Sequence, residues 1–179
     1  MLKIYKTENG GKLIKLKQSR NVSQAWFNLI NPSGEEIEHV SSMLKVDPDI
    51  LKNSLDADER SRTEVDDGIF SAIINLPLLD EEGNFDTLPC GLVFSAKNFL
   101  TICSKDNRIL GAFNKNTAKT FDTRERTRFM LLILYKITLF NFLHSGMFRC
   151  SFSSCISTAS APRRGSCQDR CGSALPPAK

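Results

Sequence analysis

The start of the chain alternates between apolar and polar side chains, as strands with one solvent-exposed face do. Leu2 and Ile4 alternate with Lys3 and Tyr5, and residues 13–17 repeat the alternation after Asn9-Gly10-Gly11. Asparagine and glycine tolerate the positive φ that a tight hairpin turn requires. The pattern therefore predicts a β-hairpin, followed by a buried strand over residues 25–30 that ends before Pro32.

Two helices are predicted between residues 33 and 55. Ser33 is followed three residues later by Glu36, which is a capping-box pattern, and apolar residues then recur at helical spacing through Leu44. Asp47 as N-cap and Pro48 at the first helical position begin the second helix. Each helix therefore presents one apolar face. Its members are Ile37, Val40, Met43 and Leu44 in the first helix and Ile50, Leu51 and Leu55 in the second.

Further strands are predicted over residues 62–65, 69–76, 88–94 and 99–103. Pro77 is expected to end the second of these, and a polar loop over 80–84 precedes the third. A short helix is expected at 108–113. A long helix is expected from Asp122 or Thr123 to Leu143, with a wide apolar face. Antiparallel strand pairs combined with these helices predict a mixed-sheet α/β (α+β) domain.

The apolar pattern stops at Leu143, which predicts a domain over residues 1–143 and a tail over 144–179. The tail is expected to be disordered or an artefact of out-of-frame or vector-derived translation. Its four cysteines could bind zinc or form disulfides, and neither is favoured as an ordered site. These cysteines are Cys150, Cys155, Cys167 and Cys171.

Charge and hydropathy exclude two classes of function. The formal charge of +4 lies entirely in the tail, so the domain is neutral and nucleic-acid binding is not expected. The apolar stretch from Phe129 to Leu143 is interrupted by polar residues and is shorter than the roughly 20 residues that cross a bilayer. No transmembrane segment is therefore predicted in this chain, which is expected to be soluble.

The sequence provides little for catalysis. It has two histidines, His39 and His144, and no glycine-rich phosphate loop, so an enzyme is not expected and no catalytic or cofactor-binding residue is assigned. The hairpin lysines could bind phosphate, although the exposed face of an antiparallel pair is the favoured interpretation. The acidic segment 56–67 could collect Mg²⁺, but a solvated surface is favoured and no metal ligand is assigned.

An ordered set of motifs resembles one family. It consists of Trp26–Pro32, Asp47-Pro48-Asp49-Ile50-Leu51, Leu55-Asp56 with Glu59-Arg60, Arg62-x-Glu64, Asp67-Gly68, Thr87-Leu88-Pro89, Gly91–Phe94 and Phe99–Cys103. Together they resemble the N-terminal cytoplasmic domain of CorA-type magnesium transport proteins, over about residues 1–143. The resemblance implies a mixed, largely antiparallel sheet sandwiched by helices. It also implies a homopentamer at the cytoplasmic face of the cell membrane.

The resemblance further implies a fragment of a Mg²⁺ or divalent metal ion transporter. The membrane spans would belong to a C-terminal part missing here, so the chain alone would not transport. It would contribute subunit packing and ion-sensitive gating, with Mg²⁺ as the transported or regulatory ion. The family's ion-sensing acidic pair corresponds to Lys52 and Asn53 here, so no ligand is carried over. The alternative is a free-standing binding module whose Cys-rich tail binds zinc or a partner.

Overall fold

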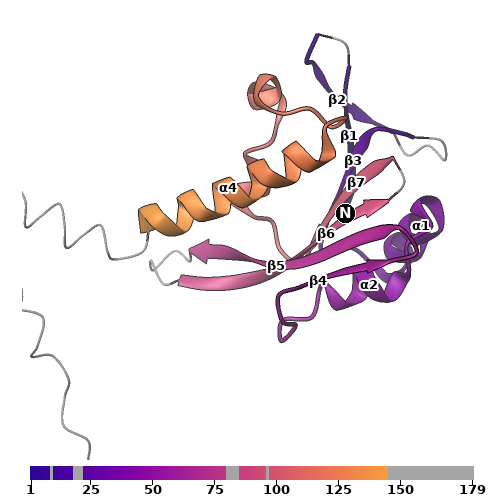
Figure 1. Ribbon diagram of the computed structural model, residues 1–179, viewed down its shortest axis with the longest axis vertical. Helices are drawn as coiled ribbons and strands as arrows, with labels where there is room; N and C mark the ends of the chain where they lie inside the picture. Colours follow the sequence, from indigo (N-terminus) through magenta and orange to yellow (C-terminus); the bar gives the residue numbers. More distant parts are fainter. Residues whose placement is uncertain (9, 18–21, 80–84, 96, 145–179) are drawn as a thin grey trace, which may run out of the picture. The chain divides into compact units, whose positions relative to one another are not determined.

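The computed structural model describes residues 1–8, 10–17, 22–79, 85–95 and 97–144, and within them a seven-stranded sheet (Figure 1). The strand order is β2-β1-β3-β7-β6-β5-β4, so β2 and β4 are its two edges. Every neighbouring pair is antiparallel except β3 with β7. The strands are β1 Leu2–Thr7, β2 Leu13–Leu16, β3 Ala25–Ile30, β4 Arg62–Asp66, β5 Ile69–Leu79, β6 Phe85–Ser95 and β7 Asn98–Cys103.

Helices cover both faces of this sheet. On one face, α1 (Gly34–Leu44) and α2 (Pro48–Asn53) bury Val40 and Leu51 against the strands. On the other face lie α3 (Arg108–Gly111), the 3₁₀ helix η1 (Lys115–Thr120) and α4 (Arg126–His144). The predicted fold class, a mixed and largely antiparallel sheet sandwiched by helices, is therefore confirmed. Residues Met1–Asn141 form the compact unit described below.

Trp26 in β3 organises the face covered by α4. Its side chain is 1% exposed, and its indole Nε1 donates a 2.9 Å hydrogen bond to Thr101 Oγ1 on β7. The ring meets Phe113, Phe121 and Phe129 edge-on, with centroids 5.0–6.4 Å away. Edge-to-face packing of this kind adds to the stabilisation from buried area. The aromatic cluster therefore fixes α3, η1 and α4 on one part of the sheet.

The prediction that Pro77 ends its strand is wrong. β5 continues to Leu79, and β6 begins at Phe85 rather than at Leu88. Pro77 and Pro89 lie within the β5–β6 ladder, opposite Thr87 and Asn75. Proline is tolerated there because β4 pairs only with the first residues of β5, and β7 pairs with β6 only from Cys90 onward. At Pro77 and Pro89, therefore, neither β4 nor β7 needs the N–H group that the proline lacks.

The long helix begins at Arg126, later than the predicted start at Asp122 or Thr123. Thr123 is held by β1 instead, because its N–H donates to Thr7 Oγ1 and its own Oγ1 accepts from the Thr7 N–H. The predicted apolar face is confirmed, since Phe129 and Ile133 are fully buried. No helix in the described part of the chain has both the length and the apolar character needed to cross a membrane.

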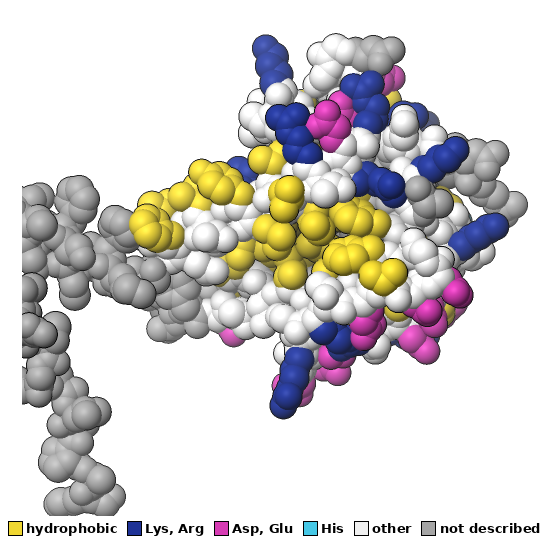
Figure 2. Space-filling view, in the orientation of Figure 1, with side chains coloured by type: hydrophobic (Ala, Val, Ile, Leu, Met, Phe, Trp, Pro, Cys, Tyr) yellow, Lys and Arg dark blue, Asp and Glu magenta, His cyan; other side chains and the backbone are white. Residues whose placement is uncertain are grey.

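The opposite side of α4 is also apolar. Leu131, Tyr135 and Leu139 follow each other at four-residue spacing, and each is at least 40% exposed. Figure 2 shows apolar side chains gathered over α4 and the surface beside it. A helix that is apolar on all sides is typically covered on all sides.

Candidate functional site

The C-terminal end of α2 is where the sequence placed the counterpart of an ion-sensing pair. Lys52 Nζ lies 3.4 Å from Glu38 Oε1 on α1 and 3.7 Å from Asp49 Oδ1 on α2. Its ammonium group therefore lies beside two carboxylates that could otherwise attract a free cation. Lys52 and Asn53 are both exposed, so these ion pairs contribute little to stability.

Close packing against the sheet positions α2. Gly91 in β6 faces the last turn of this helix, and a Cβ atom at position 91 would lie 2.7 Å from Ser54 Cβ and 2.8 Å from Ile102 Cγ2. Ser54 Oγ donates a 2.9 Å hydrogen bond to the Ile50 carbonyl, which holds that turn together. Glycine at position 91 therefore allows α2, and with it Lys52, to approach the sheet.

The acidic segment 56–67 leads into the edge strand β4 and contains six carboxylates and two arginines. Arg62 binds Glu64 through a 2.8 Å Nε–Oε1 hydrogen bond and also forms an ion pair with Glu59. The hydrogen bond to Glu64, with the charges of both acids, raises the pKa of the Arg62 guanidinium. Two of the six carboxylates are thus already paired with a fixed positive charge.

The described residues contain no group of three His, Cys, Asp or Glu side chains that could hold a metal ion. The carboxylates of the acidic segment are spread along the chain, and Asp56 Oδ1 accepts a 3.0 Å hydrogen bond from the Asp58 N–H. This local turn uses acceptor capacity that a cation would need. Within the described residues, this surface is acidic without forming a coordination site. The four tail cysteines considered for zinc lie outside the described residues.

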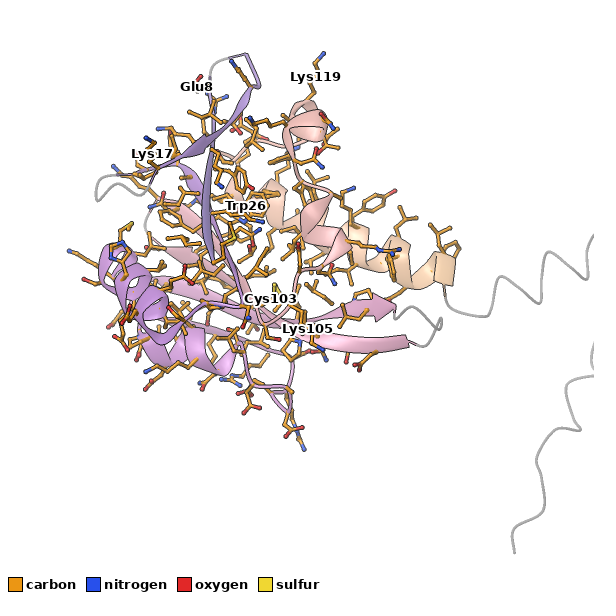
Figure 3. The ribbon with its side chains drawn as sticks, turned by 180° about the vertical axis from the view of Figure 1, so that it is seen from behind. Glu8, Lys17, Trp26, Cys103, Lys105 and Lys119 are labelled. Carbon is orange, nitrogen blue, oxygen red and sulfur yellow. The ribbon has the colours of Figure 1, made fainter. Side chains whose placement is uncertain are left out.

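The opposite edge of the sheet carries a basic hollow of 650 Å³ between β2 and η1. Four lysines line it: Lys12, Lys15, Lys115 and Lys119. None of these lysines forms an ion pair with a carboxylate of the described residues. Figure 3 labels Lys119 and, on the neighbouring hairpin, Glu8. Only the hairpin lysines were predictable from the sequence pattern, because η1 was not predicted.

In the sequence, Asn114 and Thr117 are the residues that indicate the start of η1. The Asn114 side chain accepts from the Asn116 N–H, and Thr117 Oγ1 accepts from the Asn114 N–H. This is a reciprocal cap of the kind that begins a helical turn. The pattern Asn-x-x-Thr could therefore have placed Lys115 and Lys119 on a helical turn. It could not have placed that turn beside β2, which lies about 100 residues earlier in the sequence.

Solved structures that are similar to this chain cover most of its length. Neither protein-family profiles nor curated proteins give a match. Among solved structures, the complete CorA magnesium transporter from Methanocaldococcus jannaschii matches with a TM-score of 0.68 and 20% identity, covering 91% of this chain and 53% of that one. The soluble domain of the same transporter matches with a TM-score of 0.60 and 21% identity, covering 77% and 56%.

A third match is the ZntB cytoplasmic domain from Vibrio parahaemolyticus, with a TM-score of 0.65 and 9% identity, covering 85% of this chain and 63% of that one. The chain thus spans between 53 and 63% of the length of these three structures. Because all three identities are low, the similarity establishes the fold. This chain has the fold of the matching part of the cytoplasmic domain of CorA-type transporters.

Proposed function

We propose that this chain is a fragment of the cytoplasmic domain of a CorA-like transporter of Mg²⁺ or another divalent metal ion. The observation that carries the proposal is the match of 91% of the chain to a magnesium transporter structure at a TM-score of 0.68. In this proposal the domain lies at the cytoplasmic face of the membrane. It is joined to membrane spans in the parent protein and does not transport ions alone.

The proposed role of the domain is to pack against further copies of itself. The two edges of its sheet carry opposite charge, with lysines beside β2 and an excess of carboxylates beside β4. Surfaces of opposite charge on opposite edges favour head-to-tail contacts between identical subunits, and such contacts form a ring when the rotation closes. This arrangement supports a homo-oligomer, for which the resemblance implies five subunits.

Ion-sensitive gating at the end of α2 would have to overcome the ion pairs of Lys52. A regulatory Mg²⁺ ion would have to compete with the Lys52 ammonium for Glu38 and Asp49. A tethered cation is always present at high effective concentration, whereas Mg²⁺ also has to lose water from its hydration shell. We therefore place the contribution of this domain in subunit packing.

Charge reversal at the two edges tests the packing role. We expect Lys115→Glu/Lys119→Glu and Asp66→Lys/Asp67→Lys each to weaken self-association of the full chain by at least about tenfold in sedimentation equilibrium, because each places like charges opposite each other. Mixing the two variants should restore association between unlike variants, since one then has two acidic edges and the other two basic edges. A ring of five cannot alternate two kinds of subunit, so the mixture should form open or even-numbered assemblies. Asp86→Lys on β6 is the matched control and should leave association unchanged.

The same measurement separates the proposal from its alternative. A wild-type chain that remains monomeric up to millimolar concentration would contradict the packing role and favour a free-standing binding module. Equal association of wild type and both edge variants would place the contact elsewhere. In that case the exposed Leu131, Tyr135 and Leu139 of α4 would be the next surface to test.

A further inference from the structure

Two cysteines lie directly opposite each other in the middle of the sheet. Cys90 on β6 and Cys103 on β7 are Cα partners in the antiparallel ladder. Both are fully buried in the core beneath α4, and neither is in a disulfide. Opposed residues of an antiparallel pair have Cα atoms about 4.5–5.5 Å apart and side chains on the same face. Disulfides span Cα separations of about 4.4–6.8 Å, so the backbone is already within range.

The two thiols have different acidities. The neighbouring Cys90 thiol, which can donate a hydrogen bond to a thiolate at position 103, lowers the pKa of Cys103. The interaction with Cys103, together with burial, raises the pKa of Cys90 well above its ordinary value. Cys103 is therefore the thiol that ionises first, and the thiolate is the nucleophilic form.

Cys103 is also the cysteine that is closer in sequence to exposed residues. It is the last residue of β7, and its Sγ lies 3.1 Å from the carbonyl oxygen of Lys105 (Figure 3). Ser104 is half-buried, whereas Lys105 and Asp106 are exposed. A small neutral oxidant has only this short segment to pass, while bulky thiol reagents are excluded by the packed core.

We propose that Cys90 and Cys103 form a redox-sensitive dithiol that hydrogen peroxide converts into a disulfide between β6 and β7. In the first step the Cys103 thiolate attacks one peroxide oxygen, the O–O bond breaks, and the released hydroxide takes up a proton to leave as water. Cys103 is then a sulfenic acid. In the second step the Cys90 sulfur displaces that hydroxyl group, which leaves as a second water with the Cys90 proton. Two thiols and one peroxide thus yield one disulfide and two waters.

The disulfide would join β6 and β7 covalently on the face of the sheet that α4 covers. It closes a loop of 12 residues, 91–102, which removes chain entropy from the unfolded state. We therefore expect the oxidised protein to melt at a temperature higher by on the order of 5 °C or more. The effect concerns the rigidity of the domain and does not depend on the proposed transport function.

The test uses the full chain with Cys150, Cys155, Cys167 and Cys171 replaced by serine, so that only the proposed pair can react. The folded protein is treated with hydrogen peroxide, unfolded in N-ethylmaleimide and analysed by mass spectrometry. We expect loss of two hydrogen atoms, no alkylation, a linked peptide pair containing Cys90 and Cys103, and full reversal by dithiothreitol.

Two single variants test the assigned roles. With Cys90→Ser, a sulfenic acid should persist on Cys103 because the resolving thiol is gone, and dimedone added as the protein is unfolded should trap it. With Cys103→Ser, Cys90 should stay reduced. The proposal is overturned if both cysteines are alkylated after peroxide treatment of the folded parent protein. It is also overturned if peroxide yields sulfinic acid without a cross-link, or if the cross-link forms only in urea. Because those outcomes are read on the parent protein, they hold even where a single variant fails to fold.

Discussion

Gly91 is a residue whose missing side chain lets a helix pack closely on the sheet. A methyl group there would press on Ser54 of the last turn of α2 and on Ile102 of β7, both of which are buried. We expect Gly91→Ala to lower the free energy of unfolding by about 1–3 kcal/mol, because neither neighbour can move without disturbing its own packing. Urea denaturation monitored by Trp26 fluorescence measures this.

Gly111→Ala is the matched control for that substitution. No atom lies within 4 Å of a Cβ at position 111, so stability should change by less than about 0.5 kcal/mol. Equal stability of the Gly91→Ala and Gly111→Ala proteins would mean that α2 does not lie against β6 as described.

Lys52 is a residue whose charge can be reversed by substitution. Lys52→Glu would place a third carboxylate beside Glu38 and Asp49, and clustered carboxylate oxygens are ligands that Mg²⁺ accepts. We expect this variant to bind Mg²⁺ with a Kd on the order of 1 mM by isothermal titration calorimetry, as weak oxygen sites do. Wild type should show no saturable binding at this surface, and Lys52→Gln separates the added carboxylate from the lost ammonium. Identical titrations of all three proteins would contradict this description of the surface.

Among the elements, α1 has its N-terminus tied to the start of the chain. Glu36 Oε2 lies 2.8 Å from the Met1 amino group, and Glu36 Oε1 accepts from the Leu2 N–H. Glu36 also completes the capping box with Ser33. The hydrogen bond to the charged amino terminus is the main reason that the pKa of Glu36 is lowered.

This lowered pKa sets the sign of a pH effect on α1. A carboxyl group whose pKa is lower in the folded protein stabilises it above the unfolded pKa of about 4.3, and this contribution is lost as the pH falls through the folded pKa. We expect Glu36→Gln to lose less than about 1 kcal/mol at pH 7 and to show a shallower acid transition below pH 4. Thermal melts between pH 3 and pH 7 measure this, with Glu35→Gln as control. Parallel pH profiles for wild type and Glu36→Gln would contradict it.

Elements were predictable from sequence where local chemistry decides them. The capping box at Ser33 and Pro48 at the first helical position place α1 and α2 correctly. The ends of β5 and β6 were not predictable, because Pro77 is tolerated only where the next strand has already ended. The start of α4 was missed for a similar reason, since Thr123 bonds to Thr7, more than 100 residues away.

At the scale of the whole molecule, sequence predicted the fold class through pattern and resemblance but not the strand order. The parallel pair β3–β7 joins segments about 70 residues apart and follows from no local signal. The basic hollow has the same origin, because Lys12 and Lys15 meet Lys115 and Lys119 only in the folded domain. The departure at Lys52 and Asn53 was visible in sequence, whereas the ion pairs of Lys52 required the structure.

Magnesium uptake by a chimera tests the central claim most directly. Residues 1–143 would replace only the matching part of the soluble domain of the Methanocaldococcus jannaschii CorA transporter, since this chain covers 56% of that domain. The chimera would be reconstituted into liposomes that contain a Mg²⁺-sensitive dye. If the chain is part of the cytoplasmic domain of such a transporter, uptake should exceed that of empty liposomes and approach that of the parent. A chimera that is folded, inserted and oligomeric yet takes up no Mg²⁺ would contradict the account.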